Sequence, residues 1–377
     1  KTFKLIILKK TLRHLELFAG IGGFRKAIDL YCKDNNLISN CIGFSEIDKF
    51  ATLTYKSNYD TSNEVEIGDI QKFTSNKEKI NALQDFDLLS GGFPCQAFSM
   101  MGKQKGFGDN RGNIFYNIID VLLVKKPKYV LLENVRNIKN HDKGRTYREI
   151  IRSLEEDAGY YVTSNVFNSS DFGLPQTRRR IFFFAIRKDL IDSRINLDNE
   201  VIKNQNINSK NSTSIKKYKN VLDNLLENEV DQKYYLSEKI KPTILSNGSK
   251  NFKSKSEINQ LIARPLTATM VKMHRACQDN YYSDEFLNNS NPIEYLKKKF
   301  SKVEQAKHQI RKLTPLEALK LQGFDKEFYS NASNAGVSNH QLYKQAGNAV
   351  SVNTVYYIIH YLFKSNIIEL ENDQPHK

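Results

Sequence analysis

Three short polar motifs follow apolar segments in the first half of the chain, and they contain the side chains best suited to chemistry. One is Gly91–Ser99 (GGFPCQAFS), directly after the apolar run 86–90. Its Cys95 stands where open α/β sheets bind their ligands, beyond the carboxyl end of a strand. A cysteine that only filled the core would more naturally lie within the strand. The polar, Gly- and Lys-rich stretch 100–112 that follows is typical of a loop that closes over a substrate, or of an ordinary surface loop.

An acid and a group of arginines accompany two other apolar runs. Glu133 ends the run 129–132 and opens the segment ENV. Burying its charge is costly without a partner, and burial raises the pKa of a carboxyl, which suits a group that donates or shares a proton. A salt-bridged structural glutamate is the alternative. Arg178–Arg180 of QTRRR precede the run 181–186, so they need anionic or carbonyl partners, although at least one of them is expected to be solvated.

The third motif is the glycine-rich turn Phe18–Gly23 (FAGIGG), between a predicted strand and a predicted helix. Glycines there let the backbone turn tightly and approach a ligand closely. Glu46 ends the second predicted strand, where a carboxylate can bind the ribose hydroxyls of a nucleoside cofactor, and Asp69 could meet the adenine. Taken singly, each acid is better explained as a solvated surface residue, and the glycines are equally well explained as a structural turn.

Short strands alternating with helices must position these motifs. The apolar runs predict strands, and the amphipathic stretches between them predict helices, so we expect a mostly parallel sheet covered on both faces. The stretch 195–214 is rich in Asn, Ser and Lys and indicates a domain boundary with a mobile insertion. Shorter elements fill 216–312. The strands are expected at 12–18, 40–45, 86–90, 129–132 and 181–186, and the helices at 24–31, 114–124, 146–155, 314–321 and 350–363.

Composition limits the class of protein. Lys plus Arg number 57 against 42 for Asp plus Glu, so the formal net charge is +15, which favours a nucleic-acid partner, with plain solubility as the alternative. The four cysteines, Cys32, Cys41, Cys95 and Cys277, show no metal-binding spacing and fit a reducing compartment. No apolar run approaches the length of a membrane span, and no signal peptide is visible after Lys1.

Six motifs together carry a resemblance to a known family. The chain resembles the DNA (cytosine-5)-methyltransferases of the bacterial restriction–modification type, closely over 12–188 and clearly over 310–362. The six motifs stand in the same order as in that family. The resemblance implies an α/β, Rossmann-like fold dependent on S-adenosylmethionine, with helices on both faces of the sheet and a smaller, irregular target-recognition domain. It implies a catalytic domain at 1–190, a target-recognition domain at 191–312 and a hinge and return at 313–377. The motifs are FAGIGG at 18–23, GFPCQAFS at 92–99, ENV at 133–135, QTRRR at 176–180, RPLT at 264–267 and GNAV at 347–350.

The resemblance also implies residue roles. Cys95 would add to C6 of a cytosine, Glu133 would hold the N3 edge, and Arg180 would contact O2, with Arg178 as the other catalytic arginine that matches the motif. The cofactor positions would be Phe18, Gly20, Gly22, Gly23, Glu46, Asp69, Ile70, Pro94 and Asn348. DNA would be bound by Gln96, Ser99, Lys103 and Arg111. No metal is expected. Lys272, His274 and Arg275 are weaker candidates for DNA contacts, whereas Arg264 and Cys277 are expected to be structural.

The implied reaction is methyl transfer from S-adenosylmethionine to C5 of a cytosine flipped out of a short specific sequence in double-stranded DNA. C5 is a poor nucleophile, so covalent addition at C6 is needed, and a carboxyl and an arginine stabilise the charge that develops on the ring. We expect a monomeric cytoplasmic enzyme without membrane contact, which protects DNA from a cognate restriction endonuclease that is its genetic partner. A tRNA cytosine-5 methyltransferase and a catalytically silent DNA-binding relative are the alternatives. The absence of a Pro-Pro pair disfavours an amino-group methyltransferase.

Overall fold

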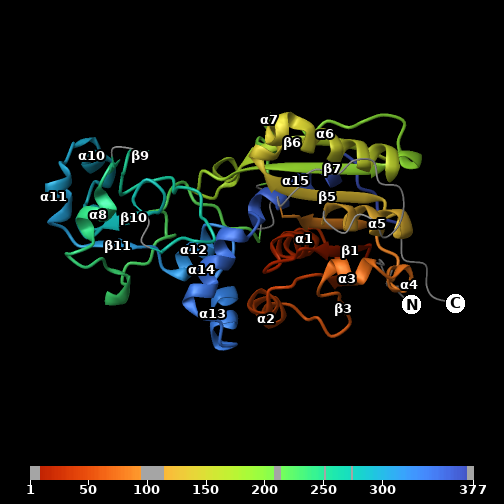
Figure 1. Cartoon of the computed structure of the whole chain (residues 1–377), viewed down its shortest axis with the longest axis horizontal. Coiled ribbons are helices and arrows are strands. Elements are labelled where there is room, and N and C mark those ends of the chain that lie inside the picture. The colour runs from red at the N-terminus through yellow and green to blue at the C-terminus, as the bar shows by residue number, and fades with distance from the viewer. Residues whose placement is uncertain (1–8, 95–113, 208–213, 250–251, 273–274, 372–377) are drawn as a thin grey trace, which may run out of the picture. The chain divides into compact units, whose positions relative to one another are not determined.

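The computed structural model describes residues 9–94, 114–207, 214–249, 252–272 and 275–371 (Figure 1). They form two compact units. Unit 1 comprises the residues up to Phe167, Arg179–Ile215 and those from Thr354 onward, and unit 2 comprises Asn168–Arg178 and Lys216–Asn353. This division differs from the predicted boundaries at 190/191 and 312/313. Unit 2 takes in the QTR part of QTRRR, and the return to unit 1 begins only at Thr354.

Unit 1 contains a seven-stranded sheet with the order β3-β2-β1-β4-β5-β7-β6. The neighbours from β3 to β5 pair in parallel, and β5 pairs antiparallel with β7. The mostly parallel sheet is therefore confirmed, and all five predicted strands are present. The strands are β1 (Thr11–Leu17), β2 (Ile38–Phe44), β3 (Val65–Glu66), β4 (Leu88–Gly92), β5 (Tyr129–Val135), β6 (Tyr160–Asn168) and β7 (Arg179–Arg187).

Helices cover both faces of this sheet, as expected. Phe183 of β7 faces α5 and α6, whereas its neighbour Phe182 points to the opposite face and meets Phe24 of α1 with ring centroids 6.5 Å apart. On that second face, Tyr31 of α1 stacks on Phe363 of α15. The helices of unit 1 are α1 (Gly23–Asp34), α2 (Lys49–Asn58), α3 (Ile70–Thr74), α4 (Lys77–Asn81), α5 (Phe115–Lys125), α6 (Arg145–Arg152) and α7 (Asn199–Lys203), together with α15 (Val352–Lys364), which begins at the boundary.

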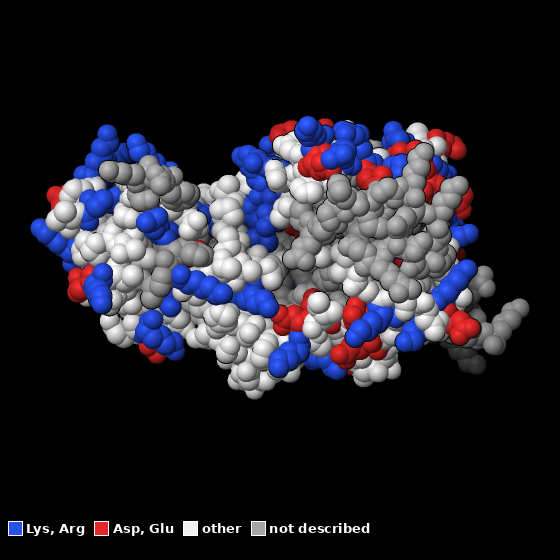
Figure 2. Space-filling view, viewed as in Figure 1, with Lys and Arg blue, Asp and Glu red and all other residues white. Residues whose placement is uncertain are grey.

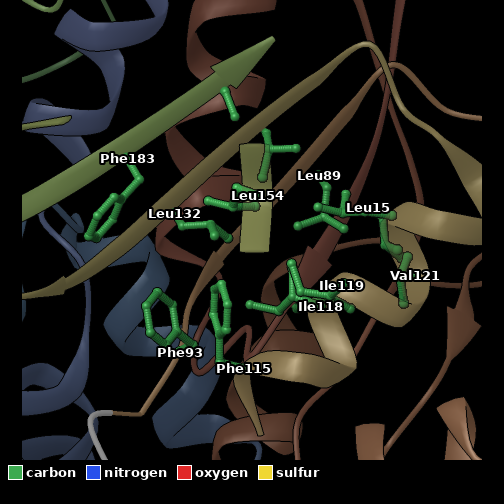
Figure 3. Close-up of a cluster of buried hydrophobic side chains, with 14 of the residues drawn as sticks. Leu15, Leu89, Phe93, Phe115, Ile118, Ile119, Val121, Leu132, Leu154 and Phe183 are labelled. Atoms are coloured by element: carbon green, nitrogen blue, oxygen red, sulfur yellow. The ribbon is translucent and has the colours of Figure 1, made fainter. Parts of the chain in front are cut away.

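The core of unit 1 lies between the sheet and α5. Figure 3 shows side chains from β1, β4, β5 and β7 meeting one face of α5, with Phe93 beside Phe115 at one end of the cluster. Apolar burial stabilises this layer by about 25 cal/mol for each Å² removed from water. The strand ends that precede the polar motifs are therefore held rigidly. The labelled residues are Leu15, Leu89, Phe93, Phe115, Ile118, Ile119, Val121, Leu132, Leu154 and Phe183.

The stretch 195–214, predicted as a domain boundary with a mobile insertion, packs on unit 1 where the structure describes it, and the boundary to unit 2 follows it at 215/216. It contains α7, and Leu197, Ile202 and Ile207 are buried in unit 1. The side-chain amide of Asn165 also donates to the carbonyl of Leu197 at 2.8 Å. The polar composition reflects the exposed side of this segment, while its few apolar residues pack inward. Residues 208–213 lie outside the described residues.

Unit 2 is built from short elements, as expected for the smaller irregular domain. A two-stranded ribbon of β10 and β11 pairs Tyr281 with Lys312, and Tyr281 and Ile310 join Ile244 and Ile258 in a small core. The described elements are α8 (Lys241–Leu245), β8 (Gly248–Ser249), β9 (Phe252–Lys253), β10 (Tyr281–Ser283), α9 (Asp284–Leu287), α10 (Pro292–Lys297), α11 (Lys302–Ala306), β11 (Ile310–Lys312), α12 (Pro315–Lys320), α13 (Lys326–Asn334) and α14 (Asn339–Asn348).

A buried ion pair explains why α12 belongs to unit 2. Both terminal nitrogens of Arg311 donate to the carboxylate of Glu317 at 2.9 Å, and both side chains are almost fully buried. Glu317 also closes a capping box with Thr314 and accepts the backbone N–H of Glu227. Breaking a buried pair by removing one partner is strongly destabilising. These bonds tie the start of α12 to β11 and to the segment around Glu227.

A cluster of buried charged groups lies in unit 1 between β1, α1 and α2. The guanidinium of Arg25 forms ion pairs with Asp29 at 2.8 Å and with Glu64 at 2.5 Å. Glu16 is fully buried on β1, and its Oε2 accepts the hydroxyl of Tyr55 at 3.4 Å. Burial raises the pKa of Glu16 from 4.5 to about 8, against the opposing attraction of Arg25.

We expect the substitution Glu16→Gln to change how stability depends on pH. Because the folded state binds the proton more tightly, Glu16 contributes stability that is present below its unfolded pKa and is lost as the pH rises through about 8. Glutamine does not titrate. The unfolding free energy of the wild type, relative to Glu16→Gln, should therefore fall between about pH 5 and pH 8 in urea titrations. The exposed Glu66→Gln serves as the control, and a constant difference over this range would refute the assignment.

Candidate active site

The polar motifs of unit 1 meet at one edge of the sheet. The strands β1, β2, β4 and β5 run parallel, so their carboxyl ends lie together. The strands β1, β2 and β4 lead into Phe18, Glu46 and Phe93, and Asn134 is the last residue but one of β5. The strand β7 runs the other way, so its first residues lie at the same edge, where Arg180 pairs in register with Val135 of β5. This edge is where open α/β sheets bind their ligands.

The glycine-rich turn is tied to the end of β2. Glu46 receives three backbone hydrogen bonds, from Gly20 at 2.8 Å, from Ile47 at 2.8 Å and from Asp48 at 2.7 Å. A carboxylate can accept about four hydrogen bonds, so capacity remains for a ligand hydroxyl. Gly20 has a φ of +55°, and no atom of the described residues lies within 4 Å of the position where a Cβ would stand. Among the described residues, the turn therefore leaves space beside a positioned acceptor.

Two residues of this region have properties that the sequence does not reveal. Phe18 has a φ of +53°, a conformation that costs a non-glycine residue energy and is often found at functional sites. Its backbone N–H donates to the hydroxyl of Ser45 at 3.0 Å, which holds it there. Ile47 follows Glu46 with 76% of its surface exposed, so it offers an apolar surface outside the core. Phe18 already belongs to the predicted cofactor positions, whereas only its exposure marks Ile47, and neither the strain nor the exposure can be inferred from residue type.

The remaining predicted cofactor residues are placed differently from one another. Asp69 caps α3 by accepting the backbone N–H of Gln71 at 3.0 Å and stays partly exposed. The side chain of Ile70 is buried in the core, so only its backbone could reach a ligand. Asn348 is exposed at the end of α14 and belongs to unit 2. Gly23 is buried as the first residue of α1.

The predicted acid and one predicted arginine form a pair at the sheet edge. The Nε of Arg180 lies 3.0 Å from Oε1 of Glu133, with 22% and 13% of the side chains exposed. Such a charge-assisted contact is stronger than a neutral hydrogen bond. Glu133 lies in register with Gly92 of β4, and a Cβ on Gly92 would come within 3.2 Å of Oε2 of Glu133. The carboxyl group is therefore beside the strand end from which the Cys95 segment starts.

A neighbouring amide positions the start of that segment. The side chain of Asn134 is buried and donates to the carbonyl of Phe93 at 2.8 Å, while its Oδ1 accepts the N–H of Val135. Asn134 belongs to the ENV motif, from which the sequence predicted a role only for Glu133. Phe93 is buried, and Pro94 is exposed. Cys95, Gln96, Ser99, Lys103 and Arg111 lie outside the described residues.

Arg178 has partners of a different kind from those of Arg180. Only 2% of Arg178 is exposed, and it lies in unit 2. One terminal nitrogen donates to the carbonyl of Leu266 at 3.0 Å, and the other donates to Gly347 at 3.0 Å and Ala349 at 2.9 Å. These carbonyls belong to the RPLT and GNAV motifs, so Arg178 joins three motifs of the chain. Arg179, between the two, is exposed as expected for one arginine of the three.

The weaker candidates for DNA contacts, and the two residues predicted to be structural, lie in unit 2. Lys272 is exposed, Arg275 is partly buried, and His274 lies outside the described residues. Figure 2 shows that Lys and Arg outnumber Asp and Glu on the visible surface around α8, α10 and α11. Arg264 donates to the carbonyl of Ala276 at 3.0 Å and exchanges hydrogen bonds with Asn280 through its backbone, so its contacts are structural. Cys277 is partly buried and unpaired.

The part of the chain that the structure describes lacks a metal cluster and a membrane-spanning helix. No group of three or more His, Cys, Asp or Glu side chains there could hold a metal ion. Among the same residues, no helix combines the length and the apolar character needed to cross a bilayer.

Comparisons with known proteins agree on one family. The model of the C-5 cytosine-specific DNA methylases matches residues 12–364. The Type II methyltransferase M1.ScrFI of Lactococcus lactis subsp. cremoris is 36% identical over 352 residues, which cover 93% of this chain and 78% of that protein. M.HpaII of Haemophilus parainfluenzae is 33% identical over 355 residues, with 92% and 87% covered. The crystal structure of S. pombe Dnmt2 methyltransferase shares the fold, with a TM-score of 0.70 and 22% identity over 95% of this chain and 100% of that one.

Proposed function

The chain belongs to the C-5 cytosine-specific DNA methylase family, and we propose that it methylates a cytosine flipped out of a short specific sequence in duplex DNA through a covalent bond between Cys95 and C6. DNA cytosine-5 methylation dependent on S-adenosylmethionine is the activity of this family. The observation that carries the finer proposal is the Glu133–Arg180 pair beside the end of β4, from which the Cys95 segment starts. A binding module would need no such pair there.

The groups around the glycine-rich turn are suited to S-adenosylmethionine, which supplies the methyl group that the activated C5 accepts. Backbone N–H groups fill three of the roughly four acceptor sites of the Glu46 carboxylate. The remaining site suits a ribose hydroxyl. The exposed side chain of Ile47 and the strained Phe18 offer apolar surfaces for the adenine. Asp69 keeps a partly exposed carboxylate at the start of α3 for the polar edge of that base.

The proposed chemistry assigns each protein group one task. The thiolate of Cys95 forms a bond to C6, and the displaced electron pair makes C5 nucleophilic. Glu133 gives a proton to N3 and Arg180 donates to O2, so the charge that develops on the ring is stabilised where it arises. After C5 accepts the methyl group, it loses its proton to solvent, the bond between Cys95 and C6 breaks by elimination to release the thiolate, and N3 returns its proton to Glu133, which restores the double bond of the ring.

Other residues have positioning and binding roles in this proposal. Arg178 would organise the RPLT and GNAV segments through its three carbonyl partners, since its terminal nitrogens are already occupied. Gln96, Ser99, Lys103 and Arg111 would grip the distorted DNA backbone, which offsets part of the cost of flipping the base. The basic surface of unit 2 suits target recognition. In this proposal the protein acts as a monomer, and its methylation protects DNA from a cognate restriction endonuclease.

The experiment that tests the covalent mechanism is trapping. DNA with 5-fluorocytosine at the target base should leave the protein covalently attached in a denaturing gel when S-adenosylmethionine is present. Fluorine cannot leave C5 as a proton does, so elimination is blocked and the Cys95 adduct persists. Cys95→Ser and unmodified DNA should give no adduct. An active preparation that forms no adduct would contradict attack at C6.

A further inference from the structure

The glycine-rich turn has a conformation that must be held from outside. Three of its residues, Phe18, Gly20 and Gly22, have positive φ values of 53°, 55° and 81°. Glycine adopts a positive φ readily, so Gly20 and Gly22 leave the turn free to take other conformations unless contacts fix it, whereas Phe18 keeps its φ only when the surrounding structure holds it. The first half of the turn is held by hydrogen bonds to the end of β2, from Phe18 to Ser45 and from Gly20 to Glu46. The second half needs a support of its own.

That support comes from α2 and the residue that follows it. The hydroxyl of Tyr59 donates to the carbonyl oxygen of Gly22 at 2.7 Å. The ring also packs against the turn, because a Cβ on Gly22 would stand only 2.4 Å from Cε2 of Tyr59. Gly22 is the N-cap of α1 and has no side chain to cap it. The same carbonyl accepts the backbone N–H of Lys26 at 2.9 Å, so Tyr59 adds a side-chain hydrogen bond and a packing contact to the first helical bond of α1.

The ring of Tyr59 is itself held on two sides. Its centroid lies 4.7 Å from that of Tyr55, and the guanidinium carbon of Arg25 lies 5.3 Å above it. Arg25 cannot move freely, since it forms ion pairs with Asp29 and Glu64. Tyr55 in turn stacks on the buried Phe44 with centroids 4.3 Å apart. The contact with Gly22 thus rests on the buried charge cluster and not on a loose surface side chain.

We propose that Tyr59 is a positioning residue for cofactor binding: its hydroxyl, backed by Arg25, holds the carbonyl of Gly22 and keeps the turn 18–23 in the conformation that receives the ligand. This inference rests on the proposed function and extends it to a residue outside every motif quoted above. Tyr59 would act through the turn, so its loss should weaken cofactor binding and leave the chemical step intact.

The test uses Tyr59→Phe, which removes the hydroxyl and keeps the ring. Binding of S-adenosylhomocysteine to the full-length chain, measured by calorimetry without DNA, should weaken by about 3- to 10-fold, the factor that corresponds to one hydrogen bond. In methylation assays the KM for S-adenosylmethionine should rise by a similar factor. The kcat at saturating cofactor and the KM for DNA should not change.

A matched control separates positioning from general stability. Tyr147 of α6 shares a hydrogen bond of 2.9 Å with Ser164 on the edge strand β6, on the side of the sheet away from β1. Tyr147→Phe should lose similar thermal stability and bind S-adenosylhomocysteine as the wild type does. Wild-type binding by Tyr59→Phe, or an equal loss in both variants, would overturn the positioning role. A wild-type chain that failed to bind S-adenosylhomocysteine would overturn the proposed function as well.

Discussion

Replacing Cys95 by serine should abolish methyl transfer while leaving cofactor binding nearly intact. A serine hydroxyl is far less acidic than a thiol, whose pKa is near 8.5, so almost no alkoxide is present to attack C6. We expect kcat to fall by roughly 10⁴-fold or more, as when a covalent nucleophile is removed from other enzymes. Incorporation of tritiated methyl groups into DNA measures the loss, and calorimetry with S-adenosylhomocysteine measures the retained binding.

A second cysteine provides the control. Cys277 of unit 2 is partly buried and has no disulfide partner, so Cys277→Ser removes a thiol without changing a residue of the sheet in unit 1. This variant should incorporate methyl groups at the wild-type rate. Normal incorporation by Cys95→Ser would instead exclude the covalent mechanism, whatever the behaviour of Cys277→Ser.

The second large effect is expected for Glu133→Gln. The amide keeps the shape of the side chain, but it can neither carry the charge that Arg180 faces at 3.0 Å nor give a proton to N3. Loss of one preorganised group that stabilises developing charge lowers kcat by about 10²- to 10³-fold. Single-turnover assays at saturating DNA and cofactor should show this loss in the chemical step, with little change in the affinity for S-adenosylhomocysteine.

Another glutamate–arginine pair of unit 1 controls for stability. Glu155 has 15% of its side chain exposed and lies 2.6 Å from Arg194, so it resembles Glu133 in burial and in partner. Glu155→Gln should lower the melting temperature and leave the methylation rate unchanged. If Glu133→Gln kept the wild-type rate, the carboxyl would be only a structural partner of Arg180.

The strands of the sheet could be predicted where they are buried on both faces. Such strands appear as continuous apolar runs, which is why 129–132 and 181–186 fall inside β5 and β7. The edge strand β6 is fully buried only at Tyr160, Val162 and Phe167 and contains Thr, Ser and Asn, so no apolar run marks it. Short irregular elements such as those of unit 2 carry even less signal.

The site was only partly predictable, because residue type does not reveal partners. The sequence treats Arg178 and Arg180 alike, yet one bonds to carbonyls at Leu266, Gly347 and Ala349 and the other to a carboxylate across β5 and β7. Those carbonyls come from segments far along the chain. The same holds for Tyr59, whose contact with Gly22 depends on how α2 packs against the turn. The motifs therefore predict the residues of the reaction better than they predict the residues that position them.

The most direct test of the central claim is the identity of the methylated base. Purified full-length protein is incubated with bacterial genomic DNA and S-adenosylmethionine labelled in the methyl group, and the DNA is digested to nucleosides for mass spectrometry. The label should appear in 5-methyl-2′-deoxycytidine. Label in N4-methyl-2′-deoxycytidine or in N6-methyl-2′-deoxyadenosine, or label that enters tRNA and not DNA in a parallel reaction, would contradict the account.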